Sequence, residues 1–257
     1  MKVVILAGGY GTRLSEYTDI IPKPMVKIGG EPILKHIMNI YSNYGFKDFY
    51  IALGYKGEVI KDYFLNYKSI NSDFTVNLKD GSLNLHNSHE DDWRVTLVDT
   101  GVNTQTGGRL LNISKYLDNS TFMMTYGDGL SNVNLNKLLE FHKKHGKLAT
   151  ITAVQAIPRF GLIELDNDKV TKFSEKPKAK DSWINGGFFV FEKEVIKYIE
   201  NQHTVLEKEP LENLSKDKEL RAYKHQDFWQ CMDTKRDKDY LEEIAKNNYI
   251  PWQNYQR

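Results

Sequence analysis

The chain has 257 residues, of which 40% are hydrophobic and 27% charged, and its formal net charge is +1. This length suffices for one sizeable α/β domain, or one domain with an appendage, and the balanced charge gives no reason to expect nucleic acid as a partner. The single cysteine, Cys231, excludes an intramolecular disulfide; no apolar run approaches about 18 residues and no signal-peptide pattern opens the chain, so we expect a cytoplasmic protein.

The first element is an unbroken apolar run at residues 3–7, which predicts a strand buried on both faces. Glycines follow at positions 8, 9 and 11, directly before Thr12 and Arg13. Glycines let a ligand approach the backbone closely, and a Gly-rich turn after a buried strand can direct N–H groups at phosphate oxygens. Lys23 lies further along between two prolines, which restrict the backbone on both sides. The stretch therefore predicts a triphosphate site with two cations.

This glycine-rich stretch differs from two better-known phosphate motifs. No lysine follows the last glycine as in the P-loop, and Leu14 stands where the dinucleotide-binding fingerprint needs a glycine. Taken by itself, the pattern also fits a tight strand-to-loop turn with solvated cations.

The first half of the chain alternates between strand and helix patterns. The predicted strands are residues 49–53, 95–98, 122–126 and 149–154, and the predicted helices are 33–44, 57–65, 110–117 and 135–145, with one hairpin inside 72–85. Strands that alternate with amphipathic helices predict a mainly parallel sheet, in which ligands bind outside the carboxyl ends of the strands. The loops Gly8–Arg13 and Thr104–Arg109, together with Asp128, are all expected at this edge.

The second half has shorter elements. Residues 161–173 predict two strands joined by a turn, 188–191 and 221–224 predict strands, and 192–200, 210–220 and 237–247 predict helices. The seven histidines show no metal spacing, and His142 and His145 are expected on a solvent face. The aromatic tail at 250–255 is expected to be exposed and to dock on another surface.

Several strings resemble the signature of sugar-1-phosphate nucleotidylyltransferases, and within that family the glucose-1-phosphate cytidylyltransferases. The resemblance covers nearly the whole chain. The strings are Leu6–Leu14, Lys23–Met25, Thr106–Leu110, Tyr126–Gly129, Arg159–Gly161, Phe173–Pro177, Asn185–Val190, Glu209–Leu211 and Met232–Thr234.

The resemblance implies a role for each matching residue. Arg13 and Lys23 would be catalytic, and Asp128 and Asp233 would hold a metal. The nucleotide would contact Leu6, Ala7, Gly8, Gly9, Tyr10, Gly11, Thr12, Arg13, Lys23, Thr104, Thr106, Gly107, Gly108, Arg109, Gly127 and Asp128. The sugar phosphate would contact Gly161, Glu175, Lys176, Asn185 and Gly186.

The resemblance also implies a Rossmann-like three-layer αβα fold with a small β-rich sugar-binding portion. Residues 1–257 would form a single domain, with a nucleotide-binding half at 1–130 and a sugar-phosphate-binding half with oligomer contacts at 131–257. The implied partners are CTP, glucose 1-phosphate, Mg²⁺ and further copies of the chain, with a hexamer suggested by the family. The implied product, CDP-glucose, would begin a route to CDP-activated deoxysugars of bacterial surface polysaccharide such as O-antigen. Cys231 stands where relatives usually have proline, which leaves open how rigidly Asp233 is presented.

The residues themselves support this chemistry but leave alternatives. A sugar phosphate is largely dianionic near neutral pH and can attack a phosphorus atom without a general base, so the reaction needs positioning and charge neutralisation. Alone, Asp128 fits an ordinary turn, Asp233 fits a helix N-cap and Glu175 with Lys176 fits a solvated pair. A catalytically silent nucleotide-sugar sensor, or a thymidylyl- or uridylyltransferase, are the alternative functions.

Overall fold

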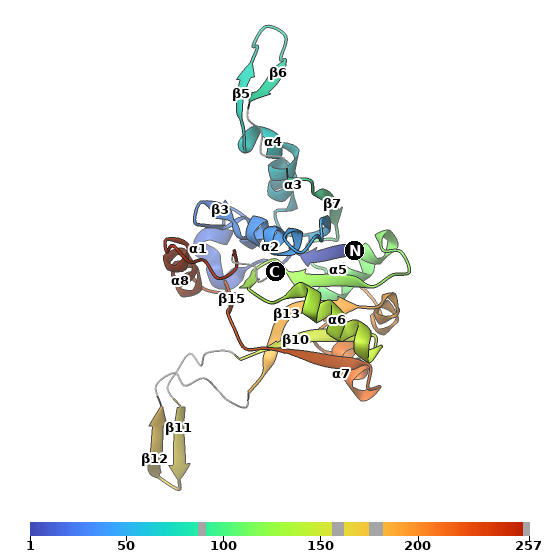
Figure 1. Ribbon diagram of the computed structural model, residues 1–257, viewed down its shortest axis with the longest axis vertical. Coiled ribbons are helices and arrows are strands. Elements are labelled where there is room, and N and C mark those ends of the chain that lie inside the picture. The colour runs from blue at the N-terminus through green and yellow to red at the C-terminus, as the bar shows by residue number, and fades with distance from the viewer. Residues whose placement is uncertain (87–90, 156–161, 175–181, 254–257) are drawn as a thin grey trace.

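The computed structural model describes residues 1–86, 91–155, 162–174 and 182–253. Its centre is a seven-stranded sheet with the strand order β14-β10-β13-β8-β1-β4-β7 (Figure 1). Within this sheet β13 pairs antiparallel with β8 and β10, whereas every other pair is parallel. This confirms the predicted α/β fold with a mainly parallel mixed sheet. The strands are β1 (Lys2–Leu6), β4 (Asp48–Leu53), β7 (Arg94–Asp99), β8 (Phe122–Tyr126), β10 (Ala149–Val154), β13 (Ile184–Phe191) and β14 (Leu220–His225).

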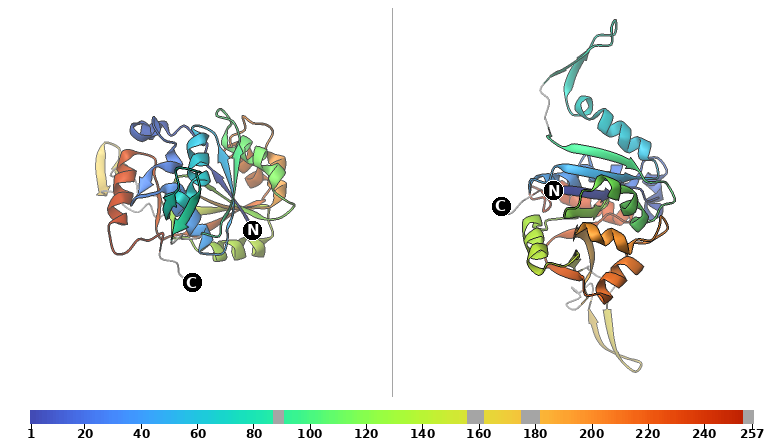
Figure 2. Two further views of the ribbon diagram at one scale, coloured as in Figure 1. Left: turned by 90° about the horizontal axis from the view of Figure 1, so that it is seen from above. Right: turned by 90° about the vertical axis from the view of Figure 1, so that its right-hand side faces the viewer.

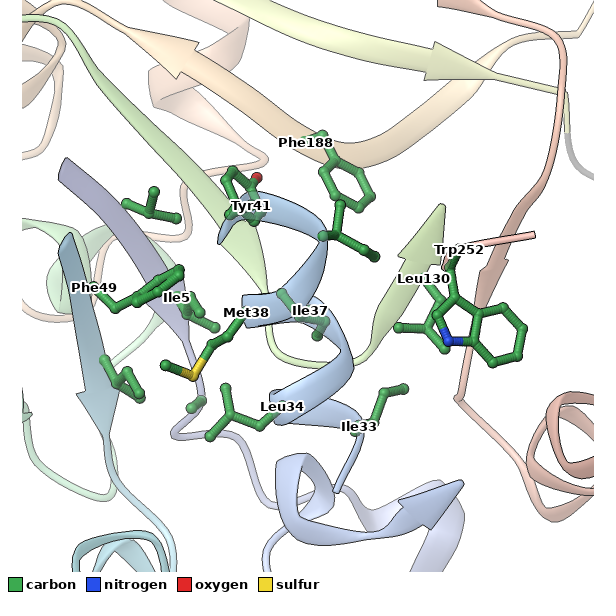
Figure 3. Packing of buried hydrophobic residues seen from close by; sticks show 14 of the residues in the cluster. Ile5, Ile33, Leu34, Ile37, Met38, Tyr41, Phe49, Leu130, Phe188 and Trp252 are labelled. Carbon is green, nitrogen blue, oxygen red and sulfur yellow. The ribbon is translucent and has the colours of Figure 1, made fainter. Parts of the chain in front are cut away.

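Buried side chains pack on both faces of the sheet. Each strand contributes to both, because successive side chains point to opposite faces. Val3 and Ile5 of β1 belong to one buried cluster with helix α2 (Ile33–Ser42), as Figure 3 shows for Ile5. Val4 and Leu6 belong to a second cluster with helix α5 (Thr106–Ile113) on the other face. A strand buried on both sides explains the unbroken apolar run at the start of the chain.

The predicted helices at 57–65 and 135–145 have the expected bounds, whereas those at 210–220 and 237–247 span Glu209–Lys216 and Lys235–Ala245 in the structure. Helix α6 begins after Asn134, whose side chain accepts a hydrogen bond from the Lys137 backbone N–H, and ends at Gly146, whose φ is +62°. Residues 192–200, predicted as a helix, form a 3-10 helix at Lys193–Tyr198. The other helices are α1 (Ser15–Thr18), α3 (Gly57–Leu65), α4 (Tyr67–Ile70), α6 (Leu135–His145), α7 (Glu209–Lys216) and α8 (Lys235–Ala245). None of the helices in the described ranges is long and apolar enough to cross a bilayer.

Two hairpins project from the body at opposite ends (Figures 1 and 2). The first joins β5 (Asp73–Val76) to β6 (Leu83–His86) and extends beyond α3 and α4, which confirms the predicted hairpin. The second joins β11 (Leu162–Asp166) to β12 (Lys169–Ser174), where the sequence predicts two strands. Two further short pairs lie nearer the body, β2 (Lys27–Ile28) with β3 (Glu31–Pro32) and β9 (Gly129–Ser131) with β15 (Trp229–Cys231).

The expected exposure of the C-terminal aromatic tail is wrong for Trp252. Its side chain is 1% exposed and belongs to the cluster around α2 (Figure 3). The indole N–H donates to Nδ1 of His36 at 3.2 Å, and the ring lies 5.5 Å from that of Phe228 between centroids. Burial of so large an apolar ring offsets the entropy lost in ordering this segment, so Trp252 packs against the body of its own chain.

The expected solvent position of His142 is also wrong, since this side chain is 1% exposed. His142 Nδ1 lies 2.7 Å from Thr150 Oγ1, and its Nε2 lies 3.1 Å from a carboxylate oxygen of Glu192. His145 Nε2 approaches the same Thr150 hydroxyl at 2.7 Å. The buried face of α6 therefore includes His142 as well as the apolar residues. The imidazole can be buried because hydrogen bonds to Thr150 and Glu192 satisfy it.

Candidate functional site

A cavity of about 1950 Å³ opens at the carboxyl ends of the parallel strands. The loops after β1, β7 and β8 all contribute to its wall, as expected for ligand sites of open α/β sheets. Most of the predicted site residues line it. These are Leu6, Ala7, Gly8, Gly9, Tyr10, Gly11, Thr12, Arg13, Lys23, Thr104, Thr106, Arg109, Gly127, Asp128, Asn185 and Asp233.

The two predicted metal-binding carboxylates meet around Lys23. Lys23 Nζ lies 2.6 Å from Asp128 Oδ2 and 2.7 Å from Asp233 Oδ1. Arg13 Nη1 lies 2.8 Å from the other carboxylate oxygen of Asp233. Burial lowers the pKa of Lys23, but the charges and hydrogen bonds of Asp128 and Asp233 outweigh it and raise the pKa above its usual value. Lys23 therefore stays cationic, and four residues from distant parts of the chain form one charged cluster.

Backbone contacts hold the two aspartates together across a long sequence separation. Strands β9 and β15 pair antiparallel directly after Asp128 and before Asp233, with Cys231 opposite Gly129. The Met232 N–H donates to the Asp128 carbonyl at 2.8 Å, and the Gly127 N–H donates to the Leu6 carbonyl at 2.9 Å. The sequence carries no clear strand pattern for either short segment.

Asp233 is not the N-cap of helix α8. Thr234 occupies that position, with its hydroxyl accepting from the Asp237 N–H at 3.3 Å and the Asp237 carboxylate accepting from the Thr234 N–H at 2.8 Å. This capping box satisfies the first turn of the helix. The Asp233 carboxylate can therefore face Arg13 and Lys23 instead.

Cys231, the departure from the family pattern, lies in β15 beside this cluster. The backbone ladder with β9 supports the segment that precedes Asp233 even though proline is absent. Burial, followed by the charges of Asp233 and Asp128, raises the pKa of the Cys231 thiol to about 12. The thiol is accordingly protonated near neutral pH and is a poor nucleophile.

The donor set fits a divalent cation bound together with a phosphate. One oxygen from each of Asp128 and Asp233 converges on a single positively charged atom, Lys23 Nζ. Mg²⁺ is commonly held by one or two carboxylates, with substrate phosphates and water completing the shell. In the part of the chain that the structure describes, no group of three or more His, Cys, Asp or Glu side chains could hold a metal, so such a cation would need the phosphates.

Arg109 ties the nucleotide-side loops together. Its guanidinium donates to the carbonyls of Leu53 (3.0 Å), Gly101 (2.8 Å), Gly8 (2.9 Å) and Val102 (3.1 Å). The residue is 4% exposed, and burial lowers the pKa of the guanidinium. A Cβ on Gly8 would lie 2.2 Å from Arg109 Nη1, so the close approach requires glycine there. Arg109 therefore both lines the cavity and orders the loops that follow β1 and β7.

The predicted loop at 104–109 is partly a helix, because α5 already begins at Thr106. Gly107 and Gly108 lie in its first turn, and both of their N–H groups donate to the Thr204 carbonyl, at 3.0 and 3.2 Å. A Cβ on Gly108 would lie 2.3 Å from the Gln202 carbonyl oxygen. These two glycines therefore permit close packing of α5 against the 202–204 loop, and their contact with the nucleotide stays a prediction.

The sugar-side residues are only partly described. Asn185 lines the cavity, and the Gly186 carbonyl accepts from the Trp229 indole N–H at 2.7 Å. Gly161, Glu175 and Lys176 lie outside the described residues.

The cavity wall also includes residues that sequence reasoning did not assign to the site, among them Asn103, Tyr126 and Glu207. Asn103 Oδ1 accepts from the Tyr10 hydroxyl at 2.7 Å, and Tyr126 donates to Glu207. The position of Tyr126 just before Asp128 could have indicated that Tyr126 lines the cavity, but no sequence pattern singles out Glu207.

Comparison with known proteins places the chain among nucleotidyl transferases. The family described as "Nucleotidyl transferase" matches residues 2–248. A glucose-1-phosphate cytidylyltransferase of Salmonella typhi is 49% identical over 257 residues, which cover 100% of both chains. A probable glucose-1-phosphate cytidylyltransferase of Bacillus subtilis is 46% identical over 235 residues, or 91% of this chain and 92% of that protein.

Solved structures share the fold. The structure of HddC from Yersinia pseudotuberculosis superposes with a TM-score of 0.70 at 25% identity, over 95% of this chain and 99% of that one. A putative glucose-1-phosphate thymidylyltransferase from Bacillus anthracis, in complex with a sucrose, superposes with a TM-score of 0.70 at 19% identity over 100% of both chains. The latter likeness concerns the fold alone.

Proposed function

Because the chain belongs to the nucleotidyl transferase family, we propose that it transfers a cytidylyl group from CTP to α-D-glucose 1-phosphate, with CDP-glucose and pyrophosphate as products. The observation that carries this proposal is the 49% identity, over the full length of both chains, with a protein named glucose-1-phosphate cytidylyltransferase. The family and the activity predicted from the sequence motifs agree with this relationship. CDP-glucose would then supply enzymes that make CDP-activated deoxysugars.

The chemistry requires charge neutralisation more than a protein nucleophile. An oxygen of the sugar phosphate bonds to the α-phosphorus of CTP while the bond from that phosphorus to the pyrophosphate oxygen breaks. The sugar phosphate is already largely dianionic at neutral pH, because its second pKa is about 6. The two anions repel each other, so rate enhancement comes from alignment and from cations directed at the phosphates.

Lys23 and Arg13 are placed to supply those cations. Lys23 donates to Asp128 and Asp233, which leaves an N–H donor of its ammonium for a phosphate oxygen. Arg13 contacts Asp233 with one nitrogen, and 69% of its side chain is exposed, so its other donors can reach a ligand in the cavity. We propose that both side chains bind the triphosphate and stabilise the charge that develops on the departing pyrophosphate.

A divalent cation, for which Mg²⁺ is the natural choice among oxygen ligands, would neutralise phosphate charge and orient the α-phosphate. Asp128 and Asp233 are the residues proposed to hold it. Their carboxylates would exchange part of their contact with Lys23 for that cation, which would direct the ammonium toward the phosphates.

We also propose that the protein is a homo-oligomer. The β5–β6 hairpin carries exposed apolar side chains at Phe74, Val76, Leu78 and Leu83, and Leu78 is 90% exposed. A two-stranded hairpin is marginally stable alone in water, and apolar side chains gathered on a projection are typical of an interface. The hairpin projects from the body (Figure 2), and none of its residues lines the cavity, so a neighbouring copy could bind the hairpin without contacting the cavity wall there.

The nucleotide preference provides the test of the proposed reaction. Cytosine has an N4 amino donor where uracil and thymine have an O4 acceptor, so backbone carbonyls near Thr104 would favour cytosine. An unpaired buried polar group costs ~1–3 kcal/mol, which predicts a preference of roughly five- to 160-fold for CTP over UTP. Pyrophosphate release should be measured with glucose 1-phosphate, Mg²⁺ and each nucleoside triphosphate in turn. Equal kcat/KM for CTP, UTP and dTTP would contradict the cytidylyl assignment, and no turnover with any of them would favour a silent sensor.

A further inference from the structure

We propose that the Glu207 carboxylate binds a vicinal diol of a substrate, in the hexose of the sugar phosphate or in the ribose of the nucleotide. This inference rests on the proposed function, since it names the side chain that would recognise the uncharged part of a substrate in the same cavity. Glu207 lies between the 3-10 helix at Lys193–Tyr198 and helix α7, and its side chain lines the cavity.

The segment that carries Glu207 is fixed against helix α5. The Gly107 N–H donates to the Thr204 carbonyl at 3.0 Å, and the Leu206 N–H donates to the Thr106 hydroxyl at 2.9 Å. Leu206 is fully buried in the cluster on that face of the sheet. The side chain of Glu207 therefore extends from a fixed backbone position, although the side chain itself is exposed to the cavity.

The carboxylate is oriented by two hydroxyl groups from regular elements. Tyr126, at the end of β8, donates to Oε1, and Thr106, at the start of α5, donates to Oε2 at 2.6 Å. An ionised carboxylate accepts about four hydrogen bonds, so each oxygen keeps a lone pair for a ligand. Two adjacent acceptors held in this way match the two O–H donors of a vicinal diol.

The charges around Glu207 select against a phosphate as its ligand. Asp128 and Asp233 are paired with Lys23 and Arg13, whereas Glu207 forms no ion pair with any residue in the described ranges. Its contacts there are neutral hydroxyl donors. A phosphate beside this carboxylate would be repelled, so in a cavity that receives two phosphorylated substrates the groups that face Glu207 must be uncharged donors. Sugar hydroxyls are the donors that both substrates carry.

The neighbours of Glu207 leave two sources for the diol. Asn185 Nδ2 donates to the Tyr126 hydroxyl at 3.3 Å, which connects Glu207 to a residue expected to contact the sugar phosphate. Thr106 connects it to the helix expected to contact the nucleotide. The carboxylate therefore lies between the two expected subsites, and substrate analogues that lack single hydroxyls can separate them.

The test compares Glu207→Ala, Glu207→Gln and the wild-type protein on deoxy substrates. For each enzyme, kcat/KM is measured with 2-, 3- and 4-deoxyglucose 1-phosphate against glucose 1-phosphate, and with 2′- and 3′-deoxy-CTP against CTP. We expect the wild type to discriminate about 10- to 100-fold against one of these sets, as for a lost hydrogen bond to a charged group. In Glu207→Ala that discrimination should fall to about threefold or less. The variant has no carboxylate to accept from the hydroxyl, so loss of the hydroxyl from the substrate removes no hydrogen bond. If Glu207→Ala loses discrimination against the deoxyglucose 1-phosphates, Glu207 binds the hexose. If it loses discrimination against the deoxy-CTP analogues, Glu207 binds the ribose.

Glu200→Ala is the matched control, because Glu200 is exposed in the same connecting region and does not line the cavity. It should discriminate as the wild type does. Glu207→Gln keeps an acceptor for Thr106 or Tyr126 and serves as the test if Glu207→Ala does not fold. Unchanged discrimination against every deoxy analogue in a folded Glu207 variant would overturn the role of Glu207 while leaving the proposed reaction intact. Absence of wild-type turnover with glucose 1-phosphate and all nucleotides would overturn both.

Discussion

Lys23 has the most constrained environment of the charged cluster. Its backbone lies in a 3-10 turn that Pro24 helps to form, and its ammonium donates to Asp128 and Asp233. A cation held between two carboxylates is positioned before substrate arrives. The conformational entropy of the flexible Lys23 side chain is therefore lost when the chain folds and does not have to be lost in the transition state.

Lys23→Ala should lower kcat by about a hundredfold or more, because charge directed at transition-state phosphate oxygens typically contributes ~3–4 kcal/mol. Steady-state kinetics with CTP and glucose 1-phosphate measure this, and circular dichroism checks the fold. Lys27→Ala, which changes a nearby exposed lysine, should retain turnover. Near-wild-type kcat in a folded Lys23→Ala protein would refute the role.

Asp128→Asn and Asp233→Asn should each abolish turnover at ordinary metal concentration and raise the Mg²⁺ concentration needed for any residual rate. Each change removes one of the two anionic ligands proposed for a hard cation. Titration of rate against Mg²⁺ measures the effect. Thr234→Ala separates this role from helix capping: it should cost about 1 kcal/mol of stability without changing the Mg²⁺ requirement. If Asp233→Asn lowers only the melting temperature, the proposed metal role is wrong.

Individual elements differ in how far local sequence patterns determine them. Strand β8 and helices α3 and α6 have the bounds that the sequence predicts, because β8 begins with consecutive apolar residues and the two helices repeat theirs at helical spacing. Short strands β9 and β15 carry too few residues to show a period, although they bring Asp128 and Asp233 together. The start of α5 was hidden by Gly107 and Gly108, which favour loops locally but here allow contact with the 202–204 backbone.

The charged cluster could be anticipated only in part. The family strings indicate Arg13, Lys23, Asp128 and Asp233, and the structure brings these four side chains into contact. Arg109 was expected at the nucleotide, but its hydrogen bonds to the Gly8 and Leu53 carbonyls depend on tertiary packing. Buried polar groups such as His142 are equally hard to foresee, because their partners are distant in sequence.

The α6–β10 contact predicts acid sensitivity. Burial lowers the pKa of His142, and the hydrogen bond and charge of Glu192 only partly offset this. A histidine whose folded pKa lies below the unfolded value of about 6.5 binds its proton more readily in the unfolded chain. Stability is therefore fully present above pH 6.5 or so and is lost as the pH falls toward the folded pKa.

His142→Asn should lower the melting temperature at neutral pH but reduce the further loss between about pH 7 and pH 5.5. Thermal melts of both proteins across this range measure the slope. Some slope should remain, because burial also lowers the pKa of His36 and His225. An identical pH dependence in wild type and variant would show that His142 does not titrate as the structure indicates.

The β5–β6 hairpin belongs neither to the seven-stranded sheet nor to either buried cluster. Light scattering at micromolar concentration should give a multiple of the chain mass. Replacement of residues 73–86 by a short Gly-Ser linker should reduce that multiple without unfolding the body, because the hairpin residues belong to neither cluster. A shortened loop at the β11–β12 turn, Asn167–Asp168, is the control. A monomeric wild-type mass would contradict the proposed assembly.

The contact between Lys23 and Asp233 spans 210 residues, and Trp252 closes the cluster around α2 from still nearer the end of the chain. A ribosome therefore releases the lysine long before it releases Asp233, the second carboxylate partner. Until then Lys23 has at most one acidic partner, and nascent or prematurely terminated chains lack half of the proposed cation site. Translation products that end before β15 should consume no CTP even where their early strands have paired. Catalytic competence would thus report that synthesis has passed Asp233.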